Sequence, residues 1–263
     1  MLVHTDEKLQ DLYEKRLNWS ETTKEMGFDI HNLLANLYSD ESHFIFELLQ
    51  NAEDVAATKA IVRLYPDHLS FSHNAEKKFS FDDVRAITAV GVSTKKNETN
   101  KIGKFGLGIK SIFSLCEHFD IHSGIYNLRI FDFVVPAPLA EEPESGTRFE
   151  LWYKDPGSYD KIYQSLLRLP VHLLLFLNHL KHLEIWIGDE LIISRNTVNI
   201  NECEVKIQTE TGDFFYRLYS EDRPDFVAKL AYQMQGTMIV GQKAAKFCDS
   251  RAAFKLRMPE FAK

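Results

Sequence analysis

The stretch HFIFELLQNAEDVAAT, residues 43–58, carries the strongest fold signal in the chain. Its apolar residues recur at helical spacing, so we predict an amphipathic helix with one face in the core. Glu47, Asn51 and Asp54 stand at i, i+4 and i+7 and share an arc of about 60° that borders this apolar face. Polar side chains in a stripe beside a core call for an explanation, and two interpretations of this stripe are open.

In the functional interpretation, Asn51 offers an oxygen to a hard cation such as magnesium, and Glu47, one turn away, takes a proton from an attacking water. In the structural interpretation, the stripe is the solvated side of an ordinary amphipathic helix. The spacing alone does not decide between the two.

A second informative stretch is IGKFGLGIKS, residues 102–111. Glycines let a backbone approach a ligand closely, and the helix expected to follow would direct unpaired N–H groups at a phosphate. The spacing misses a Walker A motif because Ile109 separates Gly108 from Lys110, and it fails the dinucleotide fingerprint because a polar loop precedes it. A plain glycine-rich hairpin or helix start is the alternative. The basic segment before it, residues 91–101, adds donors that suit a phosphate.

Around these motifs the pattern alternates between helices and strands. Residues 60–64 and 69–72 are short β-prone runs separated by a proline turn, which suits a hairpin. Strand-like patterns recur over residues 118–135 and 147–153, and a helix pair is expected over residues 159–180. The remaining sequence alternates strand-like stretches with turns, so we predict an α+β sandwich.

The composition excludes several classes of protein. The 263 residues carry 31 Lys+Arg and 38 Asp+Glu, a net charge of −7, which argues against binding nucleic acid or anionic lipid by charge alone. The 3 cysteines lie far apart without a CxxC pair and indicate neither a disulfide framework nor a thiolate zinc site. No apolar run approaches the ~20 residues of a membrane span, and the first residues lack a signal-peptide core. We therefore expect a cytoplasmic protein without a membrane anchor.

A histidine-rich segment offers a weaker signal. His172, His179 and His182 stand close together, and the last two could share a metal ion. No cysteine or carboxylate nearby completes a ligand set, so we expect solvated helix residues here.

The two main motifs together resemble those of a known superfamily. FELLQNAEDV is similar to the N-box, and IGKFGLGIKS to the glycine-rich box, of the GHKL ATPases, which include gyrase, the ninety-kilodalton heat-shock chaperones, histidine kinases and MutL. The order of elements agrees as well, down to the pair Gly146 and Thr147 that enters a strand. The segments VGVSTKK and FLNHLKHLEIWIG are similar to the chaperone-type repeats of sacsin-like proteins.

This resemblance implies a fold and a domain division. The implied fold is a Bergerat-type two-layer α/β sandwich with a mixed, mostly antiparallel sheet over residues 1–155, followed by an α+β extension over residues 156–263. The extension, a helix pair and a strand-rich part, could be an incomplete second domain. Members of the superfamily often carry an effector segment downstream, so we expect the ATPase fragment of a larger protein.

The resemblance also implies roles for individual residues. Glu47 would be the general base for water attack on the γ-phosphate, Asn51 the magnesium ligand, and Asp54 a support on the nucleotide side of the same helix. Further ATP contacts would come from a lid lysine (Lys95 or its neighbour Lys96), the glycine box and a threonine near the adenine: Lys95, Gly103, Lys104, Phe105, Gly106, Leu107, Gly108 and Thr147.

One element departs from the pattern of the superfamily. Members have an Asp-x-Gly-x-Gly box whose aspartate reads the adenine amino group, whereas this chain has FSHNAEKK with His73 at the aspartate position. Asn74 could offer an amide oxygen instead, or the pair could be a plain β-turn. Because the charged acceptor and both glycines are missing, the base selectivity is open.

The function expected from these residues is magnesium-dependent binding and slow hydrolysis of ATP, with closure of a lid at residues 91–105 driving a conformational change. Expected partners are ATP and ADP, a protein client or a downstream effector domain, and a second copy of the chain in a nucleotide-dependent homodimer. The alternative is a scaffold that senses nucleotide without hydrolysing it. A DNA-transacting module is least expected because of the net charge of −7.

Overall fold

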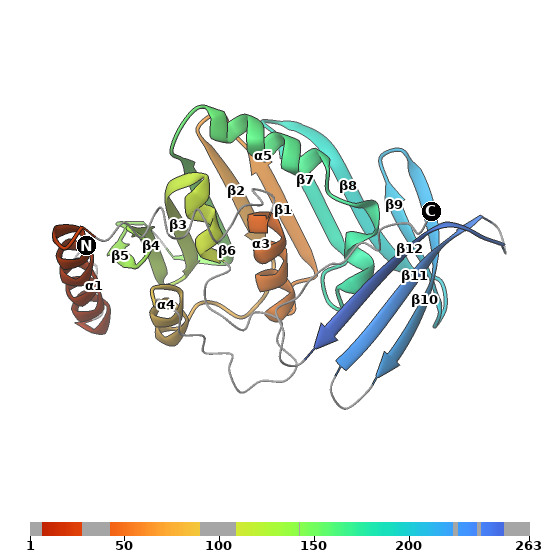
Figure 1. The fold of residues 1–263 in the computed structure, drawn as a ribbon, viewed down its shortest axis with the longest axis horizontal. Helices are drawn as coiled ribbons and strands as arrows, with labels where there is room; N and C mark the ends of the chain where they lie inside the picture. The colour runs from red at the N-terminus through yellow and green to blue at the C-terminus, as the bar shows by residue number, and fades with distance from the viewer. Residues whose placement is uncertain are drawn as a thin grey trace.

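The computed structural model describes residues 7–27, 43–89, 109–141, 143–222, 226–235 and 238–249. A 12-stranded sheet runs through this part of the chain, with the strand order β12-β11-β10-β9-β8-β7-β1-β2-β6-β3-β4-β5. Figure 1 shows helices α3 and α5 lying on one face of the sheet, which gives a sheet layer and a helix layer.

The helices are α1 (Glu7–Glu25), α3 (His43–Asp54), α4 (Phe81–Ile87) and α5 (Gly157–Leu167), with two short 3-10 helices, η1 (Ile109–Ser114) and η2 (Val171–Phe176). The first strands along the chain are β1 (Lys59–Leu64), β2 (His68–His73), β3 (Cys116–Gly124), β4 (Tyr126–Phe131), β5 (Val135–Pro138) and β6 (Glu144–Tyr153). The later strands are β7 (His182–Ile187), β8 (Glu190–Asn199), β9 (Glu204–Thr209), β10 (Gly212–Asp222), β11 (Phe226–Gln235) and β12 (Met238–Asp249).

The strand pairing is mixed. β1 forms the predicted antiparallel hairpin with β2 and, on its other side, pairs with β7 in parallel. The other neighbouring strands that the structure describes are antiparallel. A parallel neighbour cannot be reached by a hairpin, and the connection into β7 carries α5 and η2. The predicted α+β class with a mixed, mostly antiparallel sheet is confirmed, whereas the division at residue 155 stays a prediction.

Helix α3 buries its apolar face as its periodicity predicts. Phe44, Ile45, Leu48, Leu49 and Ala52 are each at most 1% exposed and share one core cluster with the inward residues of β1 and β2. Both strands alternate between buried and partly buried positions, as strands do when one face meets a core. The helix is shorter than the predicted stretch, because the chain turns after Asp54 through a positive φ of 59° at Ala56.

A buried carboxylate at the end of α3 anchors the chain that leads into β7. Glu53 is 4% exposed. Its Oε1 accepts hydrogen bonds from the backbone N–H groups of Asn178 and His179 at 2.5 and 3.1 Å, and its Oε2 from those of His179 and Leu180 at 3.0 and 2.9 Å. Hydrogen bonds to an ionised acceptor are about twice as strong as neutral ones. Glu53 therefore fixes where the parallel strand enters the sheet.

A smaller cluster lies under η2. Leu175 and Phe176 pack with Val205 and Ile207 of β9 and with Tyr216 of β10. His172, in the same short helix, is 5% exposed, so the expectation of a solvated histidine was wrong at this position. Its neighbours in η2 form a continuous apolar run, which leaves the ring inside the core.

Helix α1 lies beside β4 and β5 at the opposite end of the sheet (Figure 1). The Ser20 hydroxyl donates to the Asp132 carboxylate at 2.9 Å, and Lys24 forms an ion pair with the same group. Asp132 and Phe133 turn the chain between the two strands with positive φ angles of 47° and 65°. Among the described helices, none is long and apolar enough to cross a bilayer.

We predict that Glu53→Gln lowers the free energy of unfolding by about 2–4 kcal/mol, because an amide –NH₂ would then face backbone N–H donors. Chemical denaturation followed by circular dichroism measures this change. Glu76→Gln, at an exposed position, is the matched control and should stay within about 0.5 kcal/mol. Equal stability of the two variants would contradict the anchoring role.

Candidate functional site

Helix α3 presents the predicted polar stripe at the edge of the core. Glu47, Asn51 and Asp54 are all partly buried, between the fully buried apolar residues and the solvent. η1, which directly follows the glycine-rich segment in the sequence, packs against α3. Carboxylate and amide oxygens in such a half-buried position suit a hard cation and a proton acceptor. The roles assigned to these three residues remain predictions.

A row of polar side chains crosses three neighbouring strands on the face that carries the core. The strand register sets His73 of β2 opposite Thr147 of β6, and Thr147 opposite Ser123 of β3. The Thr147 and Ser123 hydroxyls are 2.7 Å apart, and Ser123 also accepts a hydrogen bond from the Phe79 N–H at 3.0 Å. The structure thus brings together the predicted Thr147 and the histidine at the aspartate position.

Ser123 is a member of this row that sequence reasoning missed. It lies within residues 118–135, for which the sequence predicted only strand structure, and its contact with Thr147 spans 24 positions of the chain. Only the register between β3 and β6 sets the two hydroxyls side by side. Alternation of apolar and polar residues predicts that a strand is present, but it does not predict which strand pairs with it or in which register.

His73 is a neutral hydrogen-bonding group in this setting. Its side chain is 9% exposed, and Nδ1 lies 3.3 Å from the Ala75 N–H, from which it accepts. Burial, with a smaller contribution from Lys78, lowers the pKa of His73 to about 4. The remaining proton therefore belongs on Nε2, so the ring offers an N–H donor where an aspartate would offer an acceptor.

Asn74 joins the ends of the β1–β2 hairpin. Its Oδ1 accepts from the backbone N–H groups of Thr58 and Lys59 at 3.0 and 2.9 Å, and its Nδ2 donates to the Thr58 hydroxyl at 2.8 Å. A nucleotide amino group would compete with these bonds for the amide oxygen. The contact expected between Asn74 and a nucleotide stays a prediction.

Several predicted residues lie outside the described part of the chain: Lys95, Gly103, Lys104, Phe105, Gly106, Leu107 and Gly108. The description resumes with Ile109 in η1. Lys110, the lysine that narrowly misses the Walker A position, is 2% exposed and donates from Nζ to the Phe133 carbonyl at 2.7 Å. Burial, together with the nearby Arg16, lowers the pKa of Lys110 to about 7. This lysine stabilises the turn after β4, in keeping with the rejection of a Walker A motif.

Comparison with known proteins adds a family match. A model of the Sacsin domain matches residues 70–151. Protein NO VEIN of Arabidopsis thaliana is 36% identical over 116 residues, which make up 40% of this chain and 4% of that protein. Sacsin of Homo sapiens is 31% identical over 117 residues, 38% of this chain and 2% of that protein. The chain therefore contains a segment similar to the Sacsin domain and spans a small fraction of these relatives.

The segment that matches the Sacsin domain covers part of the candidate nucleotide site. Residues 70–151 include His73, Asn74, Ser123 and Thr147, and the α3 stripe precedes them. The resemblance to sacsin-like proteins is thus supported over these strands. Membership of the wider GHKL superfamily remains a prediction.

We predict that the His73 ring stays neutral between about pH 5 and 8, because its pKa is near 4 in the folded chain. Unfolded His73 takes up its proton near pH 6.5, so this residue costs the fold stability as the pH falls from about 6.5 towards 4. Imidazole ¹H–¹⁵N spectra recorded across this range measure it, with His73→Gln to assign the signal. A titration midpoint near 6.5 would show that the ring is solvated instead.

Proposed function

We propose that this chain is a cytoplasmic, magnesium-dependent ATP-binding module that hydrolyses ATP slowly, as a sacsin-like, chaperone-related part of a larger protein. The observation that carries the proposal is the half-buried stripe of Glu47, Asn51 and Asp54 on α3. This helix packs against η1, the element that follows the glycine-rich segment in the sequence. The similarity to the Sacsin domain supports it independently.

The residues divide the chemistry between them. The Asn51 amide oxygen would complete the coordination of a magnesium ion that is otherwise held by phosphates and water, as magnesium prefers. The Glu47 carboxylate, one turn earlier, would take the proton from the attacking water. Asp54 would support the nucleotide side of the helix, and the glycine box would bind phosphates through backbone N–H groups.

Closure of residues 91–105 over bound ATP would link nucleotide state to the rest of the molecule. Contacts that exist only with the γ-phosphate would order the segment, and hydrolysis would release it. A protein client, a downstream effector domain or a second copy of the chain would bind differently to the closed and open states.

His73 bears on which base is accepted. A neutral ring with its proton on Nε2 donates a hydrogen bond, whereas the adenine amino group requires an acceptor. We therefore propose weak discrimination between ATP and GTP. The same substitution favours a second function, a scaffold that binds nucleotide without turning it over.

Removal of the metal ligand is the first test. Asn51→Ala should weaken magnesium-dependent ATP binding at least tenfold, because the cation loses its protein oxygen, and calorimetry with MgATP, MgADP and MgGTP measures this effect. Wild type in EDTA should behave like the variant, and Asn196→Ala on β8 is the matched control. Binding that is equally strong without magnesium would contradict the role of Asn51.

Removal of the general base is the second test. Glu47→Ala should keep ATP affinity and lose roughly 100-fold or more in turnover, since a positioned base contributes that much. Phosphate release measures turnover, with Glu76→Ala as an exposed control. Unchanged hydrolysis in Glu47→Ala would exclude this base. Nucleotide binding by wild type with no turnover would favour the scaffold.

A further inference from the structure

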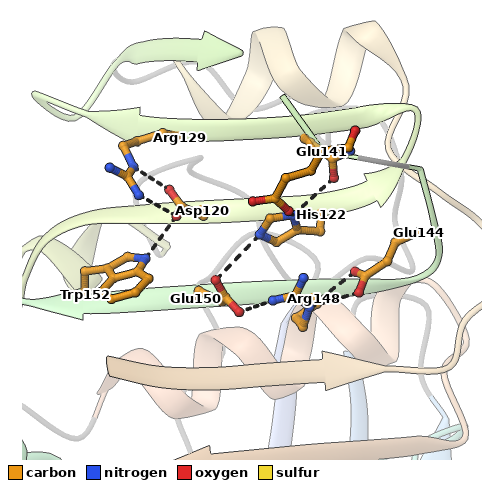
Figure 2. Close-up of polar contacts among 9 residues, drawn as sticks. Asp120, His122, Arg129, Glu141, Glu144, Arg148, Glu150 and Trp152 are labelled. Atoms are coloured by element: carbon orange, nitrogen blue, oxygen red, sulfur yellow. Dashed lines mark hydrogen bonds and ion pairs between the residues drawn. The ribbon is translucent and has the colours of Figure 1, made fainter. Parts of the chain in front are cut away.

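A second polar cluster lies on the open face of the sheet, away from the core. Asp120 and His122 are two positions apart on β3 and project to the same side, and Glu150 of β6 is the register partner of Asp120 (Figure 2). Although they face away from the core, Asp120 and His122 are 3% and 1% exposed. One ligand atom from each of the three residues lies within 4.8 Å of the other two.

The orientation of the His122 ring follows from its neighbours. Nδ1 lies 3.1 Å from the Asn127 Oδ1 and 3.0 Å from the Glu141 Oε2, and both of these are acceptors. The Asn127 Nδ2 donates to the Glu141 carbonyl at 3.1 Å, which fixes the amide with its oxygen towards the ring. Nδ1 therefore carries a proton, and Nε2 is left to accept one or to bind a cation.

The Nε2 atom lacks a hydrogen-bond partner among the described residues, although it is buried. Its nearest acidic neighbour is the Glu150 Oε2, 3.7 Å away, too far for a hydrogen bond. In the neutral ring, a nitrogen lone pair would thus face an anionic oxygen with no atom between them. Such an arrangement is unfavourable unless a cation lies between the two atoms.

Arginines position the carboxylates of Asp120 and Glu150 but leave oxygen lone pairs that can bind a cation. Arg129 donates from Nε and Nη2 to the two Asp120 oxygens at 2.8 Å each, and Trp152 donates to Oδ2 at 3.0 Å. Arg148 forms an ion pair with the Glu150 Oε1, which turns Oε2 towards His122 (Figure 2). A carboxylate oxygen has two lone pairs, so the Asp120 Oδ1 can still bind a cation beside Arg129.

We propose that His122, Glu150 and Asp120 bind a divalent transition metal ion, with Zn²⁺ as the best match, through Nε2, Oε2 and Oδ1. One imidazole and two carboxylates are a ligand set that zinc accepts, with water in the remaining position. The contact from Nδ1–H to Glu141 corresponds to the outer carboxylate that orients a zinc-bound histidine. The ion would tie β3 to β6 and stand independently of the proposed nucleotide site.

A proton competes with the proposed zinc ion for the Nε2 atom of His122. The Glu150 carboxylate beside Nε2 raises the pKa of His122, with further help from Glu141 and Asn127, while burial and Arg148 oppose the shift. Zinc binding would displace this proton, so zinc affinity should fall as the pH drops. Magnesium, which prefers oxygen ligands, should not compete.

The test is calorimetric titration of the chelator-stripped chain with ZnCl₂ and, separately, with MgCl₂. We expect one saturable zinc site of micromolar or tighter affinity in wild type, at least tenfold weaker in His122→Gln and in Glu150→Gln. His118→Gln, on the same strand and face, is the matched control and should bind like wild type. Circular dichroism checks that each variant is folded, and Glu150→Gln serves if His122→Gln is not.

Two outcomes would overturn the proposal. No saturable zinc binding by wild type would exclude a metal site at His122. Equal zinc affinity of wild type, His122→Gln and Glu150→Gln would place the ion elsewhere on the chain.

Discussion

The three backbone N–H groups bound by Glu53 set the relation between α3 and the parallel strand β7, and the middle of the sheet is arranged around that junction. The carbonyl of Thr58 accepts from Lys181 and His182 on one side, while Asn74 binds the N–H groups of Thr58 and Lys59 on the other. The end of α3, the start of β1, the end of β2 and the start of β7 thus meet within a few residues. A buried carboxylate is tolerated here because both of its oxygens accept hydrogen bonds from backbone N–H groups.

The alternation of strand residues gives the two faces of the sheet different chemistry. On the side of α3, the inward positions of β2, β6 and β3 are apolar until the row His73, Thr147 and Ser123 at one end. On the other side, β6, β3 and the neighbouring β4 carry arginines and carboxylates. There, His68 of β2 stacks between Tyr65 of the hairpin turn and Trp152 of β6. The proposed nucleotide site and the proposed metal site can therefore both use β3 and β6 without sharing a residue.

Sequence patterns predicted the parts of the fold that depend on local spacing. Helix α3, the β1–β2 hairpin and the strands within residues 118–135 and 147–153 follow from apolar periodicity, which is set by the backbone itself. The anchoring by Glu53 was not predictable, because it joins positions 125 to 127 residues apart. The sequence did not predict the cluster of Asp120, His122 and Glu150 either, because this cluster depends on the register of β3 against β6. The histidine-rich segment at residues 172–182 offers metal-ligand spacing in the sequence, but His172 lies in the core.

The turn at Asp132 and Phe133 has a consequence for how the sheet ends. It directs β5 along the outer side of β4, and β5 contains Pro136 and Pro138, which have no N–H to offer another strand. The side chains Ser20 and Lys24 hold α1 against the same turn, next to that strand. An exposed strand edge invites pairing with a neighbouring molecule and the growth of aggregates. The β5 edge thus lacks two backbone N–H donors, and helix α1 packs against it. Extension of the sheet by a strand of another molecule is therefore disfavoured at this edge.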